Sequence, residues 1–244
     1  MSWLRSYALL VRWNALRLRF LLPLFALVST GLSVGIIVGF AYLMPTVDTT
    51  SAAFLATGGP TLGLITVGLV MAPNMVAQSK LQGSFEFDQT LPVPPMASVA
   101  AGLTIWIVGA LPSLVLSVLV AAFRFDLDLQ VHGLLVPAAL LVALTATALG
   151  YGMAHALPAA AVGLVAQLIV FVTLMFSPVN FPADRLPGWL QAIHVVLPFQ
   201  YMAQVIRETL TPAAGGISVT PYAVLAAWCV VGLAATYRLM TRRG

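Results

Sequence analysis

The sequence predicts an all-α integral membrane protein: six transmembrane helices, an N-terminal interfacial helix, and an extracellular re-entrant helical hairpin before the last span. The composition is one reason, because 61% of the 244 residues are hydrophobic and 7% are charged, against about 25% charged in soluble domains. Mean hydropathy is +1.01. Six apolar runs reach the length of about 20 residues that crosses a bilayer. A seventh apolar stretch, Phe176 to Leu210, is too interrupted to do so.

The N-terminal region, residues 2–20, mixes arginines with aromatic and leucine residues. Arg5, Arg12 and Arg19 are spaced by seven residues and fall on one helical stripe. This pattern is typical of a helix that lies on an anionic leaflet with its aromatic rings at headgroup depth. A plain positive flank that only orients the next helix is the alternative.

Six spans follow this region, and we expect a single transmembrane domain over residues 1–244. The predicted spans are roughly 21–43, 52–77, 97–122, 131–155, 159–178 and 219–239. Eight of the eleven Lys and Arg residues fall on the side that holds both termini. By the positive-inside rule both termini are cytoplasmic. The domain divides into the interfacial helix, spans one to five, the extracellular hairpin, and the last span with its tail: 1–20, 21–178, 179–216 and 217–244.

The first span contains a ladder of small residues, Gly31, Gly35 and Gly39. Without side chains on that face, a second helix backbone can approach closely and pack by dispersion. The ladder therefore predicts a helix–helix contact, either within the chain or between two subunits.

The longest cytoplasmic connection lies between spans two and three, at residues 78–97. We expect Gly83 and Ser84 to open a short helix with Ser84 as its N-cap. Glu86 and Asp88 in the first turn suit the positive end of the helix dipole. Such a short acidic helix would be a docking surface for a soluble partner, and a solvated connector is the alternative.

The stretch from Phe176 to Leu210 carries charges and is divided by Pro178, Pro182, Pro187 and Pro198. The density of its apolar residues weakens the alternative of an ordinary loop, and the run from Trp189 to Leu197 is amphipathic. We therefore expect two short helices that dip into the extracytoplasmic face of the membrane.

Several kinds of chemistry are missing from the sequence. It has no G-x-x-x-x-G-K-[ST] loop for ATP, no metal-ligand spacing, and no recognisable nucleophile with a nearby histidine. We therefore assign no catalytic and no metal-binding residues. The predicted spans also lack acidic and basic residues near the bilayer centre, where ion-coupled carriers usually place them. Energy for any transport would have to come from elsewhere.

Two segments together resemble the type-2 permease family of ATP-binding cassette (ABC) exporters. The loop Gly83-Ser84-Phe85-Glu86 through Pro92-Val93 is similar to the family's G-T-L-E…P-V pattern, with Ser84 and Phe85 as replacements. Lys80-Leu81-Gln82 stands where the family usually has a charged Glu/Arg pair. The second segment is similar to the family's F-P…L-P-x-W-L…P-x-x-Y…R signature; its residues are Phe181-Pro182, Leu186-Pro187-Gly188-Trp189-Leu190, Pro198, Tyr201 and Arg207.

The resemblance implies a permease subunit in the cytoplasmic membrane that pairs with a second permease chain, as homodimer or heterodimer. It also implies two separate ATPase subunits, which would bind ATP and Mg, while this chain would hold no cofactor and would not be an enzyme. The implied ATPase-coupling residues are Gly83, Ser84, Phe85, Glu86, Asp88, Pro92 and Arg12. The implied extracellular gate consists of Pro182, Leu186, Pro187, Gly188, Trp189, Pro198 and Tyr201.

The substrate class is inferred from the lack of charged residues in the spans. An uncharged pathway suits an amphipathic or hydrophobic substrate, such as a drug, a lipid or a lipid-linked glycan, and nothing in the charge pattern predicts nucleic acid binding. Multidrug efflux is one form of this function. The alternative is a non-transporting six-span assembly or regulatory subunit.

Overall fold

The computed structural model describes residues 3–43, 49–84, 90, 92–125, 131–211 and 216–241. Every regular element in these residues is a helix, and six helices are long and apolar enough to cross a membrane. The predicted all-α membrane fold with six spans is therefore confirmed.

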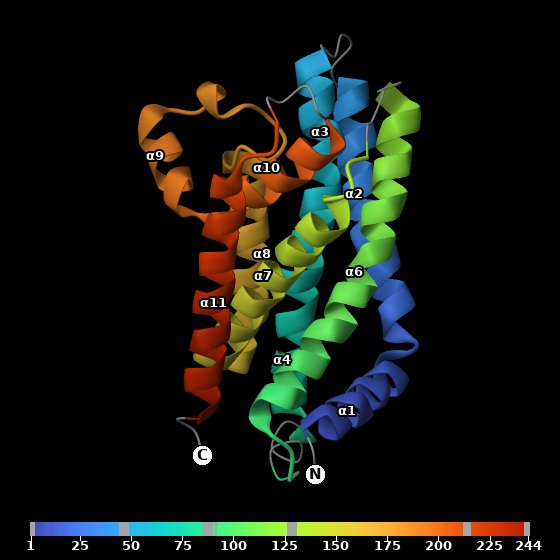
Figure 1. The fold of residues 1–244 in the computed structure, drawn as a ribbon, viewed down its shortest axis with the longest axis vertical. Coiled ribbons are helices and arrows are strands. Elements are labelled where there is room, and N and C mark those ends of the chain that lie inside the picture. The colour runs from blue at the N-terminus through green and yellow to red at the C-terminus, as the bar shows by residue number, and fades with distance from the viewer. Residues whose placement is uncertain are drawn as a thin grey trace.

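The described elements form one helical bundle with a helix across one end and two short helices at the other (Figure 1). In chain order they are α1 (Trp3–Leu18), α2 (Leu21–Leu43), α3 (Thr49–Thr66), η1 (Val67–Met71), α4 (Ala72–Leu81), α6 (Pro95–Phe125), α7 (Leu135–Ala156), α8 (Ala159–Phe176), η2 (Ala183–Arg185), α9 (Gly188–Val196), α10 (Pro198–Leu210) and α11 (Val219–Thr241).

The second span is longer than predicted. Segments α3, η1 and α4 form one continuous helix that ends at Leu81, beyond the expected loop start at Gln78. Gly83, with φ of +73°, adopts the left-handed conformation just after this helix. Such a glycine is a common end for a helix. Gly83 therefore closes α4, whereas the sequence assigned it only to the start of the next helix.

The α3–η1–α4 helix is the core of the bundle. Within its most apolar window 89% of the residues are buried, against 22% for α2 and for α8. Glycines allow this depth of packing: a Cβ at Gly68 would lie 2.6 Å from the Cβ of Ala146. A Cβ at Gly150 would lie 2.2 Å from the Gly68 carbonyl oxygen. Helices η1 and α7 thus cross with their backbones in direct contact.

A π-helical turn, η1, interrupts the middle of this helix. The Ala72 amide donates to the carbonyl of Val67, five residues earlier. Pro73, which has no amide hydrogen to donate, follows directly. A π turn holds one residue more than the α-helical path and is frequent at functional sites.

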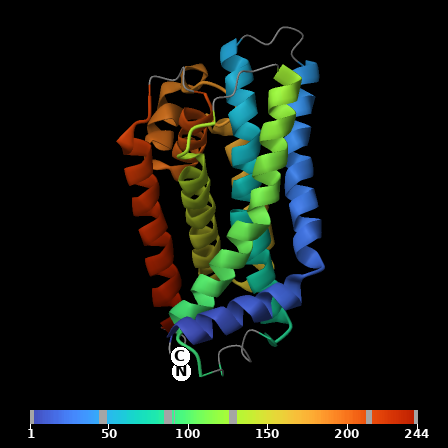
Figure 2. The same cartoon turned by 45° about the vertical axis from the view of Figure 1, so that its right-hand side comes forward.

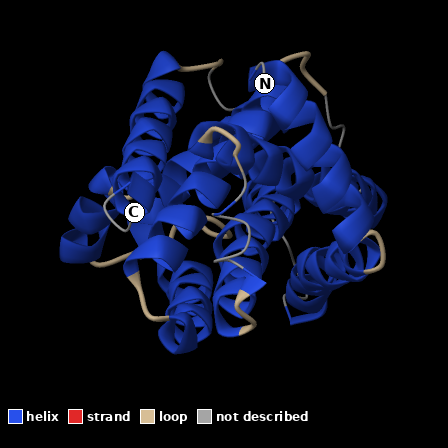
Figure 3. Cartoon of the chain, turned by 90° about the horizontal axis from the view of Figure 1, so that it is seen from below, coloured by secondary structure: helices blue, strands red, loops and turns tan. Residues whose placement is uncertain are grey.

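Helix α1 lies across the end of the bundle that also holds the described chain ends, Trp3 and Thr241 (Figures 1 and 2). We call this the α1 end, and the opposite end, with α9 and α10, the hairpin end. The Tyr7 hydroxyl and the Thr104 hydroxyl of α6 lie 2.8 Å apart and join α1 to the bundle. Seen from the α1 end, helices and the loops between them make up the described part (Figure 3).

The predicted arginine stripe of α1 faces outward. Arg5, Arg12 and Arg19 are all exposed, and so are Trp3 and Trp13. This arrangement suits a helix with cations and indole rings available to a membrane surface.

Candidate functional site

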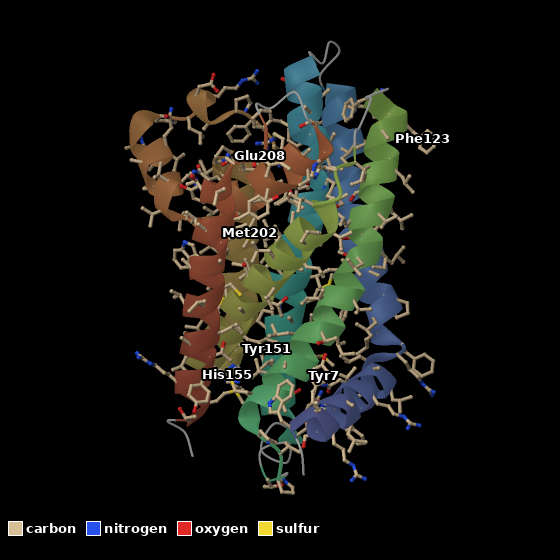
Figure 4. The ribbon with its side chains drawn as sticks, in the orientation of Figure 1. Tyr7, Phe123, Tyr151, His155, Met202 and Glu208 are labelled. Atoms are coloured by element: carbon tan, nitrogen blue, oxygen red, sulfur yellow. The ribbon has the colours of Figure 1, made fainter. Side chains whose placement is uncertain are left out.

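Helix α10 crosses the bundle at the hairpin end and is the part of the hairpin that is embedded in the fold. Pro198 occupies its first position, where the missing amide hydrogen costs nothing. One face of α10 is fully buried, with Met202, Val205, Ile206 and Leu210 at 0% exposure. Figure 4 shows Met202 on this helix within the bundle. Burial of this apolar face therefore holds α10 in the bundle, and polar contacts add to it.

The junction between α9 and α10 is closed by two side chains. The Tyr201 hydroxyl donates to the Val195 carbonyl over 2.7 Å, and the Trp228 indole N–H donates to the Val196 carbonyl over 2.9 Å. Carbonyls in the last turn of a helix have no partner within that helix. Tyr201 of α10 and Trp228 of α11 supply the missing donors, so the end of α9 is tied to both helices.

Arg207 joins α10 to the second span and to the segment after α8. Its Nε donates to the Thr57 hydroxyl over 3.2 Å, and its Nη2 donates to the Val179 carbonyl over 2.9 Å. The guanidinium carbon lies 3.7 Å from the ring centroid of Phe54. A planar guanidinium can stack on a ring while its edge donates hydrogen bonds, which an ammonium cannot do.

Burial lowers the pKa of Arg207 to about 10, and the negative charge of Glu208 opposes that shift. The side chain is still charged at neutral pH because that value lies well above 7. A positive charge is therefore held at the hairpin end, between the first residues of the second span and α10.

Glu208, labelled in Figure 4, joins α10 to the last span. Its carboxylate accepts hydrogen bonds from Gln204 over 2.9 Å, from the Ser218 hydroxyl over 2.8 Å and from the Ser218 amide over 3.0 Å. Ser218 directly precedes α11, where a negative charge is favoured by the helix dipole. Adjacent charges thus bind α10 to α3 on one side and to α11 on the other.

The structure divides the predicted gate residues into two groups. Pro198 and Tyr201, both in α10, are buried. The others lie at or near the surface, and Trp189 is 67% exposed. The amphipathic run therefore turns much of its apolar face away from the chain, including Trp189, Ile193, Val195 and Val196. The surface group comprises Pro182, Leu186, Pro187, Gly188 and Trp189.

His194 is the buried titratable residue of α9. It is 3% exposed, and neither ring nitrogen has a hydrogen-bond partner among the described residues. Burial lowers the pKa of His194 below its ordinary value, and the nearby backbone of Phe176 partly offsets this shift. The packing of α9 therefore favours the neutral imidazole.

At the α1 end, Arg17 connects the interfacial helix to the loop after α4. Its Nη2 donates to the Ser84 hydroxyl over 3.0 Å, and that hydroxyl donates to the Ser79 carbonyl over 3.3 Å. The basic residue predicted for ATPase coupling is Arg12 instead, and its side chain is exposed. Among the predicted coupling residues, Gly83, Ser84 and the exposed Pro92 are described, whereas Phe85, Glu86 and Asp88 lie outside the described residues.

Lys80 links the same end of α4 to α7. Its ammonium donates to the carbonyl of Ala154, in the last turn of α7. A cation at a helix C-terminus is favoured by the helix dipole. The loop, α1, α4 and α7 are therefore neighbours at the α1 end.

The glycine ladder of α2 does not pack within the described chain. A Cβ built at Gly31, Gly35 or Gly39 would meet no described heavy atom within 4 Å outside the helix itself. All three glycines are exposed. Of the two predicted contacts, the one within the chain is therefore not made by the described residues.

The comparison with protein families agrees with this architecture. The bundle of six spanning helices is that of a multi-pass membrane protein. The family model described as ABC-2 type transporter matches residues 6–211. The chain therefore belongs to the ABC-2 type transporter family. It is a permease component of an ABC transporter rather than an ATPase, and this family works with ATPase subunits. A comparison with curated proteins gave no match.

The contacts of Arg17, Glu208 and Trp228 were not predicted from the sequence. For Arg207 and Glu208 the sequence does indicate that each has a polar partner, because charged residues inside an apolar stretch are costly unless they are paired. Their partners could not be read in the same way, because Thr57 and Arg207 are 150 residues apart.

Proposed function

We propose that the chain is the transmembrane permease subunit of an ATP-driven exporter in the cytoplasmic membrane, with both termini cytoplasmic. It would move an amphipathic or hydrophobic substrate: a drug, a lipid or a lipid-linked glycan. Two ATPase subunits would bind ATP and Mg at the α1 end. The hairpin, with Pro182, Leu186, Pro187, Gly188, Trp189, Pro198 and Tyr201, would form the extracellular gate.

One observation supports this proposal most. The continuous helix α3–η1–α4 has Phe54 and Thr57 beside Arg207 near one end and Ser79 beside Ser84 near the other. A continuous, buried helix of this kind would carry a displacement from an ATPase docking site to the hairpin. The docking site would comprise Gly83, Ser84, Phe85, Glu86, Asp88 and Pro92 with α1, and we add Arg17 to Arg12 as its basic residue.

The test is reconstitution with the ATPase. The tagged chain should co-purify with an ATPase subunit, and the complex in lipid vesicles should move substrate only when ATP is hydrolysed. Movement by the chain alone, driven by an ion gradient, would overturn the proposal. A stable complex that hydrolyses ATP but moves none of the three substrate classes would favour the alternative, a non-transporting assembly or regulatory subunit.

We further propose that a second permease chain covers the exposed glycine ladder of α2. Gly35→Leu should leave the fold of the single chain unchanged, because nothing described lies within 4 Å of a Cβ there. It should weaken dimerisation, because the added side chain would keep the backbone of a second helix from approaching closely. Cross-linking and mass measurement in detergent would test this, with Val231→Leu, exposed on α11, as the control. Unchanged dimerisation in Gly35→Leu would assign the interface to another face.

A further inference from the structure

Gln167 presents an amide side chain on the surface of a membrane span. It lies in the middle of α8, about 12 Å from Ala159 at one end and about 14 Å from Phe176 at the other, at about 1.5 Å per residue. The side chain is exposed, and it has no hydrogen-bond partner among the described residues. A glutamine side chain is too short to reach the lipid headgroups from this depth. The amide therefore lies at the level of the hydrocarbon core.

Polar side chains in the middle of other spans lie inside the fold. Ser33 of α2, Ser113 of α6 and Thr145 of α7 are all 0% exposed. Ser33 donates to a carbonyl of α3, and Thr145 donates to a carbonyl of α11. An amide without a partner in hydrocarbon is unfavourable, and membrane helices use such groups to hydrogen-bond across a helix contact. Gln167 therefore indicates a contact with a molecule outside this chain.

The residues around Gln167 form an apolar stripe with the spacing of a helix-packing seam. Leu164, Leu168, Phe171 and Met175 are 44–77% exposed and follow one another at intervals of three or four residues. Helix pairs interdigitate side chains with this spacing. Large apolar side chains offer water no hydrogen bonds, so the stripe does not suit a water-filled path. It has the form of a helix contact that contains one amide.

A second copy of this chain offers a matching group to that amide. Two copies with the same topology are related by a two-fold axis along the membrane normal, so equivalent residues lie at equal depth. An amide has both donors and an acceptor, so the two Gln167 side chains can each donate to the other. A lipid chain offers no such group, and a transported molecule would leave the amide without a partner between cycles. Both α2 and α8 contact η1, so the same copy can reach the glycine ladder of α2.

We propose that two copies of this chain meet along α8, with the two Gln167 side chains hydrogen-bonded to each other in the middle of the bilayer. Leu164, Leu168, Phe171 and Met175 pack on either side of this pair. The amides set the register of the two helices, because a shift along the axis would place both amides against apolar groups. This inference rests on the proposed pairing of two permease chains and names the residues that make the contact.

Disulfide trapping in lipid vesicles tests the contact. The sequence has one cysteine, Cys229, which is buried, so Cys229→Ala gives a full chain without cysteine. Gln167→Cys in this background should form a disulfide-linked dimer on oxidation, because the two side chains face each other. Val230→Cys is the matched control, since Val230 is 65% exposed in the middle of α11. Equal dimer yields from the two variants, or no dimer from Gln167→Cys, would overturn the inference.

Energy transfer between labelled full chains in vesicles measures the strength of pairing without ATP or an ATPase. Gln167→Leu should weaken pairing about three- to tenfold, and Gln167→Asn, which keeps an amide, should weaken it less. Val230→Leu should leave it unchanged. Gln167→Leu should not lower the unfolding midpoint of the dilute single chain, because Gln167 has no hydrogen-bond partner among the described residues. Pairing of wild-type strength in Gln167→Leu would contradict the amide contact.

The outcomes separate this contact from the proposed function. A dimer that is neither trapped at residue 167 nor weakened by Gln167→Leu overturns the contact along α8 and leaves the pairing of permease chains intact. Reduced transport by Gln167→Leu with pairing of wild-type strength would place the amide on the transport pathway and overturn the contact as well. A wild-type chain that pairs only with a different permease chain would also overturn it, because the contact needs two copies.

Discussion

The two ends of the bundle are held by different kinds of contact. At the hairpin end, Arg207 and Glu208 each make two or more contacts, and Glu208 is only 8% exposed. At the α1 end, the contact between Arg17 and Ser84 is exposed. Exposed polar pairs contribute about 0–1 kcal/mol, whereas losing a partner of a buried charged group costs more. The hairpin end is thus built to stay joined to α3 and α11, whereas the contact between α1 and Ser84 costs little to break.

The largest effect is expected from breaking the hairpin end at Arg207. Arg207→Leu removes two hydrogen bonds and the stacking on Phe54, and it leaves the Val179 carbonyl without this donor. We expect a loss of about 2–4 kcal/mol, measured as denaturant-induced unfolding in detergent. Arg207→Lys should recover little, because an ammonium lacks the planar fork. Arg238→Leu, at an exposed arginine of α11, is the control, and an equal loss there would contradict the prediction.

A smaller loss is expected at the neighbouring carboxylate. Glu208→Gln keeps the shape of the side chain but turns one acceptor oxygen into a donor that faces Ser218 or Gln204. We expect about 1–3 kcal/mol, together with faster hydrogen exchange of the Ser218 amide. Asp184→Asn, at an exposed carboxylate of the same end, should change neither quantity. Unchanged exchange at Ser218 would show that Glu208 does not hold the start of α11.

The third prediction concerns pH. Because burial lowers the pKa of His194 in the folded chain, the unfolded chain binds more protons between that lowered pKa and about 6.5. Stability should therefore fall as the pH decreases through this range, by at most about 1.4 kcal/mol per pH unit. His194→Phe should flatten the curve of unfolding midpoint against pH between 5 and 8. Parallel curves for the two proteins would rule out His194 as the source.

The smallest effect is expected at the α1 end. Arg17→Ala removes the hydrogen bond to Ser84 together with the other contacts of this side chain. Because the side chain is exposed, unfolding should change by less than about 1 kcal/mol. Arg12→Ala is the matched control on the same helix. A loss at Arg17 as large as that at Arg207 would remove the contrast between the two ends.

The spans could be predicted from the sequence because length and apolar content are local properties. The end of the second span was placed too early because Gln78 and Lys80 are polar, although α4 continues past them to Leu81. The helix stops instead where Gly83 adopts its left-handed conformation. Polar residues such as Gln78 indicate where an apolar span ends, but the helix itself ends where the backbone conformation changes at Gly83.

In the hairpin, the starts of the helices follow from local sequence, but the burial of individual side chains does not. Pro187 directly precedes α9 and Pro198 opens α10, in keeping with the preference of proline for helix starts, whereas the sequence-based prediction only takes them to divide the stretch into short pieces. The burial of Tyr201 and the exposure of Trp189 depend on how α10 docks against distant helices, which no local pattern encodes. The roles of the predicted gate and coupling residues, and the division of the chain at residues 20, 178 and 216, stay predictions.

The π turn at Val67–Met71 has a consequence for rotation. One extra residue in an α-helix shifts everything beyond it by about 100° around the axis, because each turn takes 3.6 residues. Thr57 lies on one side of this turn and Ser79 on the other. The extra residue therefore sets the angular phase between the half of the helix that meets Arg207 and the half that meets the loop at Ser84. Deleting one residue there would turn the two halves out of register while the helix itself stayed unbroken.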